Sequence, residues 1–144
     1  MRAAEERYET DHDAAPLDML VALFDARGWP CESGAGEMSG EVQGSWTTYQ
    51  VKGIWRPEDQ VLQILCLPDV RVSPDKRAAA HELVALINEQ MWLGHFDVWS
   101  NGGMLLYRSG TILGDEGLLS LSQAQALVEI AVDECARGSS TSTP

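Results

Sequence analysis

Apolar residues recur at helical spacing in three stretches of the chain. In the first stretch they fall at i, i+3, i+4 and i+7, namely at Leu17, Leu20, Val21 and Phe24. Pro16 is favourable in the first turn of a helix and Gly28 at its C-terminal end, so the sequence predicts a short helix between them. The second stretch follows Ser73-Pro74-Asp75, a typical helix start, and is expected to run to about Trp92 with the apolar stripe Ala80, Leu83, Val84, Ile87 and Met91.

The second and third predicted helices differ in the width of their apolar faces. The second carries Ala79 and Leu86 beside its stripe, so we expect it to contact something on a second side. In the third, Ser122 and Gln125 have capping-box spacing, and the helix is expected to end near Arg137-Gly138. One face of this third helix is lined by Ala124, Leu127, Val128, Ala131 and Cys135.

The alternation typical of strands occupies the segments between the helices. Trp46 and Ile54 lie on the polar face of the run SWTTYQVKGIW, opposite the alternating residues Thr47, Tyr49, Val51 and Trp55. The run VLQILCL is apolar on both faces apart from Gln63, as expected of a central strand. The runs HFDVWS and GMLLYRS predict a hairpin with a two-residue turn at Asn101-Gly102, while SGAGEMSG and WRPEDQ are predicted loops.

These elements predict an α+β fold with the order helix, three or four strands, helix, two strands, helix. No strand-helix-strand alternation occurs, so the expected sheet is antiparallel, with the helices packed on one of its faces. One domain is expected over residues 14–137, because 144 residues suffice for a single hydrophobic core. Residues 1–13 and 138–144 have no apolar stripe, and we expect both segments to be disordered tails.

The charge of the chain narrows the choice of partner. Ten Lys and Arg residues stand against 22 Asp and Glu residues, which gives a formal net charge of −12. This charge repels nucleic acid and anionic membrane surfaces, so we expect neither as a partner. The N-terminus has no apolar signal-peptide core, and no run approaches the roughly 18 apolar residues of a membrane span. The three Cys residues are scattered, and together these features predict a cytoplasmic protein with reduced thiols.

Sequence motifs for catalysis or metal binding are incomplete. His81-Glu82 begins like the zinc motif H-E-x-x-H, but Ala85 stands where the second His is needed. The segment GAGEMSG lacks the spacing and the Lys of a phosphate-binding loop, and it is interpreted as a flexible turn. Ser39 and Ser45 lack the G-x-S-x-G elbow, and Cys31 has no signature of a reactive thiol. We therefore expect no catalytic residue, no metal ion and no cofactor.

Large apolar residues outside the predicted core are candidates for an interaction surface. The stretch INEQMWLGHFDVWSNGG contains a helix-to-strand corner, in which Phe96 and Val98 alternate with His95, Asp97 and Trp99. Exposed aromatic residues typically mark protein contacts, although they can also cap the edge of a core. The candidates for a partner or dimer surface are Trp46, Ile54, Leu86, Trp92 and Trp99.

The sequence resembles the YbjN domain proteins of bacteria. The resemblance rests on the first helix closed by GWP, on VQGSWTTYQVKGIWR, on LINEQMWLGHFDVWSNGGMLLYR and on LVEIAVDECAR, and it covers about Pro16 to Arg137. It implies a fold like that of type III secretion chaperones, which commonly dimerise, and a role as a sensory-transduction regulator or chaperone-like module. Family members often continue past the last helix with an aromatic-rich segment, whereas this sequence ends in GSSTSTP. The resemblance implies no catalytic residues.

Two functional hypotheses follow from these observations. The first is a cytoplasmic, non-catalytic interaction domain, a homodimer that holds a segment of an unidentified partner protein against exposed apolar surface. The alternative is a small-molecule-sensing regulator, or a hydrolase without a recognised motif, with a pocket near His95 and Asp97. A deep polar pocket joining those residues to Cys31 or His81 would favour the alternative. A shallow apolar groove would favour the interaction domain.

Overall fold

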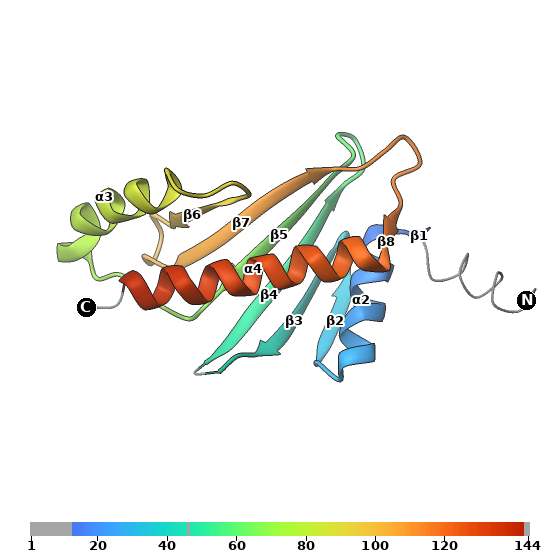
Figure 1. Cartoon of the computed structure of the whole chain (residues 1–144), viewed down its shortest axis with the longest axis horizontal. Coiled ribbons are helices and arrows are strands. Elements are labelled where there is room, and N and C mark those ends of the chain that lie inside the picture. The colour runs from blue at the N-terminus through green and yellow to red at the C-terminus, as the bar shows by residue number, and fades with distance from the viewer. Residues whose placement is uncertain (1–12, 46, 143–144) are drawn as a thin grey trace, which may run out of the picture.

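The computed structural model in Figure 1 describes residues 13–142 apart from residue 46. Six strands form one antiparallel sheet in the order β2-β3-β4-β5-β7-β6. They are β2 (Cys31–Gly34), β3 (Glu37–Gln43), β4 (Thr48–Arg56), β5 (Val61–Leu67), β6 (His95–Val98) and β7 (Leu105–Ile112). The helices are α2 (Pro16–Arg27), α3 (Arg77–Asn88), which follows the 3-10 turn η1 (Pro74–Lys76), and α4 (Leu121–Ser142). Two short strands, β1 (Asp13–Ala14) and β8 (Leu119–Ser120), pair with each other.

The predicted fold class and order of elements are confirmed. Helices α2 and α4 cover one face of the sheet, and α3 lies at the end of the sheet beside β6 (Figure 1). The core lies between the helices and this face, because the predicted alternation of β4 is correct and turns Tyr49 and Val51 inward. The largest fully buried side chains of this core include Leu20, Phe24, Met38, Tyr49, Leu62, Ile64, Phe96, Tyr107, Leu119 and Val128.

The opposite face of the sheet carries a smaller apolar cluster. Leu65, Leu67 and Leu106 are buried there, with Ile54 and Met104 packed against them. This agrees with the expectation that β5 is apolar on both faces, since β5 pairs with β4 on one side and β7 on the other. No described helix packs on this cluster.

Helix α4 differs from its prediction at both ends. The capping box uses Ser120 and Gln123, two residues before the predicted pair. The amide of Gln123 donates to Ser120 Oγ (3.1 Å), and the amide of Ser120 donates to Gln123 Oε1 (3.0 Å). The helix also continues to Ser142, beyond its predicted end near Arg137-Gly138. Gly138 is buried against the ring of Phe96 and serves close packing instead of ending the helix.

Helix α3 ends at Asn88, four residues before the predicted end. The side chain of Asn88 pairs with the backbone of β6: its Nδ2 donates to Phe96 O (3.2 Å), and Phe96 N donates to its Oδ1 (2.8 Å). These two bonds satisfy backbone groups on the outer edge of the sheet. Because the helix stops here, Trp92 lies in the connection to β6 and not on α3.

Two hairpin turns also differ from their predictions. The β6-β7 hairpin exists, but its turn covers residues 100–103, with Trp99 N bonded to Met104 O (2.9 Å). Gly103 has positive φ, and a side chain there would collide with the carbonyl of Val72, whose amide donates to Gly103 O (2.8 Å). The SGAGEMSG segment was predicted to be a loop. It is instead the β2-β3 hairpin, turned by Ala35 and Gly36 at positive φ.

We expect replacement of Gly138 by Ala to destabilise the protein, although Ala favours a helix by about 1 kcal/mol over Gly. A Cβ at this position would overlap the Phe96 ring, and overpacking of this kind typically costs about 1–3 kcal/mol. Chemical denaturation followed by circular dichroism gives the free energy of unfolding. Gly34→Ala is the matched control, because its added Cβ meets no atom.

The same substitution in a Phe96→Leu background separates packing from helix propensity. The cost of Gly138→Ala should fall there, because the smaller side chain relieves the overlap. A more stable Gly138→Ala single variant would mean that the contact with Phe96 does not limit this end of α4.

Candidate interaction surface

The five candidate surface residues occupy different parts of the molecule. Trp46 lies outside the described residues. Ile54 is half-buried on the face of the sheet away from α2 and α4, where it packs on the cluster of Leu65, Leu67 and Leu106. The other three are exposed near α3 and the edge strand β6: Leu86, Trp92 and Trp99.

Three of the exposed large apolar side chains lie around the C-terminal end of α3. Trp92 is 97% exposed, and Leu86 and Leu93 are each 57% exposed. We call these three residues the α3-end patch. Leu93 was missed by the sequence analysis, because its exposure depends on the early end of α3. Trp99, at the β6-β7 turn, is 40% exposed, and Ile112, also missed, is 80% exposed at the end of β7.

A buried tyrosine holds the backbone of the α3-end patch. Tyr107 OH donates to the carbonyl oxygen of Leu93 (2.9 Å), and burial raises the pKa of Tyr107, so the hydroxyl stays a neutral donor. Gly94 follows with positive φ, and any side chain there would overlap Tyr107. The chain between α3 and β6 is therefore fixed at Leu93, while Trp92 extends into solvent.

His95 and Asp97 form an ion-pair network on the surface of the sheet. Asp97 Oδ2 lies 3.3 Å from His95 Nε2 and 3.5 Å from Arg108 Nε. The register places His95 directly opposite Arg108. All three side chains are between 37% and 47% exposed, and exposed networks of this kind contribute little to stability. His81 is exposed on α3, a different element, and Cys31 lies on β2 at the opposite edge of the sheet.

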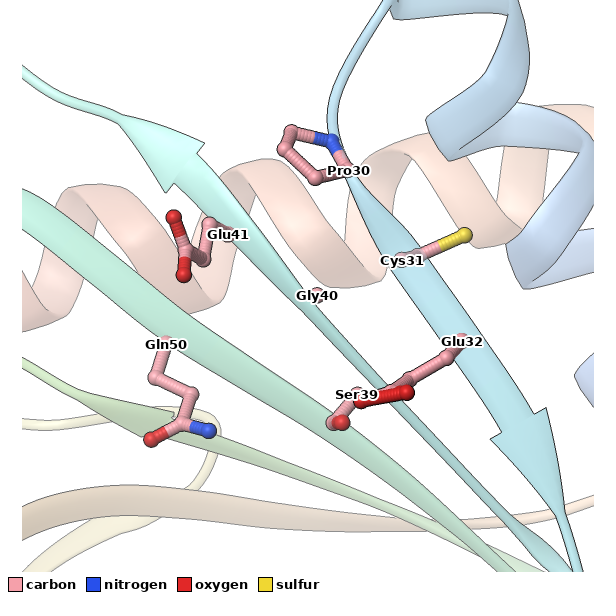
Figure 2. A pocket seen from close by; sticks show the side chains of 7 residues that line it. All are labelled: Pro30, Cys31, Glu32, Ser39, Gly40, Glu41 and Gln50. Carbon is pink, nitrogen blue, oxygen red and sulfur yellow. The ribbon is translucent and has the colours of Figure 1, made fainter.

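Cys31 lines a shallow polar cavity of about 220 Å³ at the edge of the sheet (Figure 2). The cavity also contains Glu32 and Glu41, and in Figure 2 the Cys31 sulfur points away from Glu32 and Ser39. Burial, and secondarily the carboxylate of Asp25, raise the pKa of the Cys31 thiol. A raised pKa lowers the thiolate fraction at neutral pH, and this is the opposite of what a nucleophilic cysteine needs.

The other two cysteines belong to the core. Cys66 on β5 and Cys135 on α4 are fully buried, and the Cys135 thiol lies 3.6 Å from the carbonyl oxygen of Cys66. The neighbouring Cys135 side chain, followed by burial, raises the pKa of the Cys66 thiol. Within the described residues, no three His, Cys, Asp or Glu side chains gather as metal ligands. None of the described helices is long and apolar enough to cross a membrane.

An apolar groove of about 560 Å³ lies beside α3. It is more than twice the volume of the cavity at Cys31. Its lining comes from α3, from the β6-β7 hairpin and from the segment that connects β5 to η1: Val70, Arg71, Val72, Ser73, Lys76, Ala79, Ala80, Leu83, Val84, Val98 and Leu105. The groove is mostly apolar, and His95 and Asp97 do not line it.

Cys31 should react slowly with iodoacetamide at pH 8, and Asp25→Asn should accelerate that reaction. Removing the Asp25 carboxylate lowers the pKa of the Cys31 thiol, so a larger fraction of Cys31 is thiolate at pH 8. Asp18→Asn, an exposed change elsewhere on α2, should leave the rate unchanged. Mass spectrometry of native protein should find Cys66 and Cys135 unmodified. An alkylation rate above that of free cysteine would contradict the inert thiol inferred here.

Comparison with known proteins identifies the family. The sequence matches the family model YbjN, described as "Putative bacterial sensory transduction regulator", over residues 16–140. The fold is similar to the crystal structure of YbjN, a putative transcription regulator from E. coli, with a TM-score of 0.60 and 12% sequence identity over 85% of this chain and 87% of that chain. Among curated proteins, none matches this sequence. The chain therefore belongs to the YbjN family, as its sequence motifs indicated.

Proposed function

We propose that this chain is a regulatory protein-protein interaction domain of the bacterial cytoplasm that works without catalysis. It acts as a homodimer and holds a segment of a partner protein in the manner of a chaperone. The family is described as "Putative bacterial sensory transduction regulator", and contacts with other proteins are one way in which such a regulator acts. The observation that carries the proposal is the α3-end patch, in which Trp92 is 97% exposed and Leu86 and Leu93 are each 57% exposed.

The energy of solvent exposure favours a partner at this patch. Leaving a large apolar side chain in water forgoes on the order of 1.5–3 kcal/mol relative to burial. The bond from Tyr107 to Leu93 holds the backbone outward, so the patch cannot simply collapse onto the core. Contiguous exposed apolar residues typically mark a contact surface, and a symmetric dimer is the commonest arrangement that buries one.

The absence of catalysis is part of the proposal. The Cys31 thiol has a raised pKa, and the His95-Asp97 pair is an exposed network with Arg108. A hydrolase would need a nucleophile and a base within hydrogen-bonding reach in a concave site. Cys31 and His95 lie on strands at opposite edges of the sheet, which argues against such a pair.

Charge favours a protein partner over nucleic acid or membrane. The E. coli YbjN protein is named a putative transcription regulator, but this chain carries a net charge of −12. That charge opposes direct binding to a phosphate backbone or to anionic lipid. We therefore propose that regulation by this chain works through protein contacts.

Self-association provides the first test of the proposal. We expect a dimer at micromolar concentration by sedimentation velocity. It should tighten from low to moderate salt, because screening reduces the repulsion between two subunits of charge −12. Leu86→Glu should shift the protein to monomer, because it would bury a charge in the contact.

Ala126→Glu is the matched control, since it adds the same charge at an exposed position of α4. This variant should dimerise like the wild type. Circular dichroism should show that both variants fold. A wild type that stays monomeric at both salt concentrations would contradict the homodimer, and a folded Leu86→Glu variant that still dimerises would exclude the α3-end patch as its interface.

A further inference from the structure

The groove beside α3 has its polar groups on one wall. Arg71, Ser73 and Lys76 belong to the segment between β5 and α3, whereas every other lining residue is Ala, Val or Leu. The floor is made by Val84, Val98 and Leu105, which are buried at the edge of the main core. A ligand in this groove would thus meet apolar surface along its body and positive charge at one side.

The two cations of the groove are not neutralised by ion pairs. Arg27, Arg56, Arg108 and Arg137 each pair with a carboxylate, but neither Arg71 nor Lys76 lies within ion-pair distance of a described one. Asp75 is adjacent to Lys76, and its pKa is lowered, first by a hydrogen bond from Ser73 and less by the charge of Lys76. Two cations without an ion pair beside apolar surface are available to pair with the anionic group of a ligand.

The backbone of the segment that carries Arg71 is held in place before any ligand binds. Val72 N donates to Gly103 O (2.8 Å), and Leu105 N donates to Val70 O (2.9 Å), so the segment is bonded to the β6-β7 hairpin. The guanidinium of Arg77 donates to the carbonyl oxygens of Val72 (3.3 Å) and Ser100 (3.0 Å) from the start of α3. A preformed wall reduces the ordering cost of binding.

Helix α3 has apolar surface left to bury along the groove. Val84 is the only buried residue of this 12-residue helix. Ala79 is exposed, and Ala80 and Leu83 are half-buried, although all three face the groove. An apolar ligand would cover them and gain the corresponding hydrophobic energy.

We propose that this groove binds a small amphiphilic anion, an aliphatic chain that ends in a carboxylate. The carboxylate lies against Lys76 and Arg71, and the chain lies over Val84, Val98 and Leu105 between α3 and the hairpin. The volume of about 560 Å³ is within the range of small-molecule sites, roughly 300–1,000 Å³. This site is separate from the α3-end patch, so it does not depend on the function proposed above.

The size of the groove favours a small molecule over a docked helix. The apolar part of the α3 wall runs from Ala79 to Val84, which at about 1.5 Å per residue is about 7.5 Å. A docked helix is about 10–12 Å across with its side chains, which exceeds this length, whereas an aliphatic chain is narrower and can bend within the groove. An anionic lipid surface would also have to approach a chain of charge −12, whereas a single carboxylate meets only the local cations.

Sodium decanoate is the probe that tests the site, by titration calorimetry on the full chain. We expect a dissociation constant below about 1 mM that rises with salt, because an ion pair contributes. Decanol should bind more weakly, and decyltrimethylammonium most weakly. Methyl NMR spectra should shift at Leu83, Val84 and Val98, which line the groove.

Three variants with matched controls locate the binding. Lys76→Gln and Arg71→Gln should each weaken decanoate binding about fivefold or more. Lys52→Gln, which removes a cation from β4 on the other face of the sheet, should have no effect. Ala79→Phe should abolish binding by filling the groove, and the exposed position makes the variant compatible with folding. Ala126→Phe on α4 is its control.

Several outcomes would overturn the proposal. These are no binding of decanoate, equal binding of decanol and decanoate, and unchanged binding by Ala79→Phe. Binding to anionic phospholipid vesicles that Lys76→Gln removes, without binding of free decanoate, would assign the groove to a lipid surface. Loss of the dimer in Ala79→Phe, again without decanoate binding, would assign it to a second copy of the chain. Failure of the dimer prediction alone would leave this proposal standing.

Discussion

Phe96 connects the elements at the end of the molecule where the α3-end patch and the groove lie. Its ring packs edge-on against Tyr107 of β7 (centroids 5.7 Å apart) and lies directly against Gly138 of α4. Its backbone is bonded twice to the side chain of Asn88, the last residue of α3. A single residue thus joins the last strand of the sheet to two helices. The α3-end patch depends on the same group of contacts, since Tyr107 also bonds to Leu93.

The three helices differ in how many side chains they bury against the sheet. Helix α2 buries Met19, Leu20, Leu23 and Phe24, and α4 contributes the buried residues Ala124, Val128, Ala131 and Cys135. Helix α3 buries only Val84, although its sequence is strongly amphipathic. Elements with few buried contacts open at low free-energy cost, and binding surfaces are commonly found on them. The fold therefore leaves apolar surface on its most weakly attached helix, with the groove on one side and the α3-end patch at its C-terminal end.

Local periodicity was sufficient to predict the order of elements and the inward face of β4, but several boundaries depend on contacts between distant residues. Ser120 and Gln123 have the same spacing as Ser122 and Gln125, so only the packing of Leu119 and Ala124 selects the true capping box. Gly138 resembles a helix terminator in sequence, whereas its role is to contact Phe96, 42 positions earlier. For the candidate surface, Leu86, Trp92 and Trp99 were identified from their positions outside the stripes. Leu93 was missed because its exposure depends on the early end of α3, and the groove was missed because three separate segments form it.

The excess of acidic residues explains how a groove with so few polar groups can be selective. An apolar body in the groove would cover part of the exposed Arg71 and Lys76 side chains, and a charge that loses water without gaining a partner is destabilised. A neutral ligand would incur this cost, and a cation would add repulsion to it. An anion offsets the cost by pairing with the same two side chains, which have no ion pair of their own. Elsewhere the surrounding negative charge repels anions, so the cations at the groove confine their binding to this one wall.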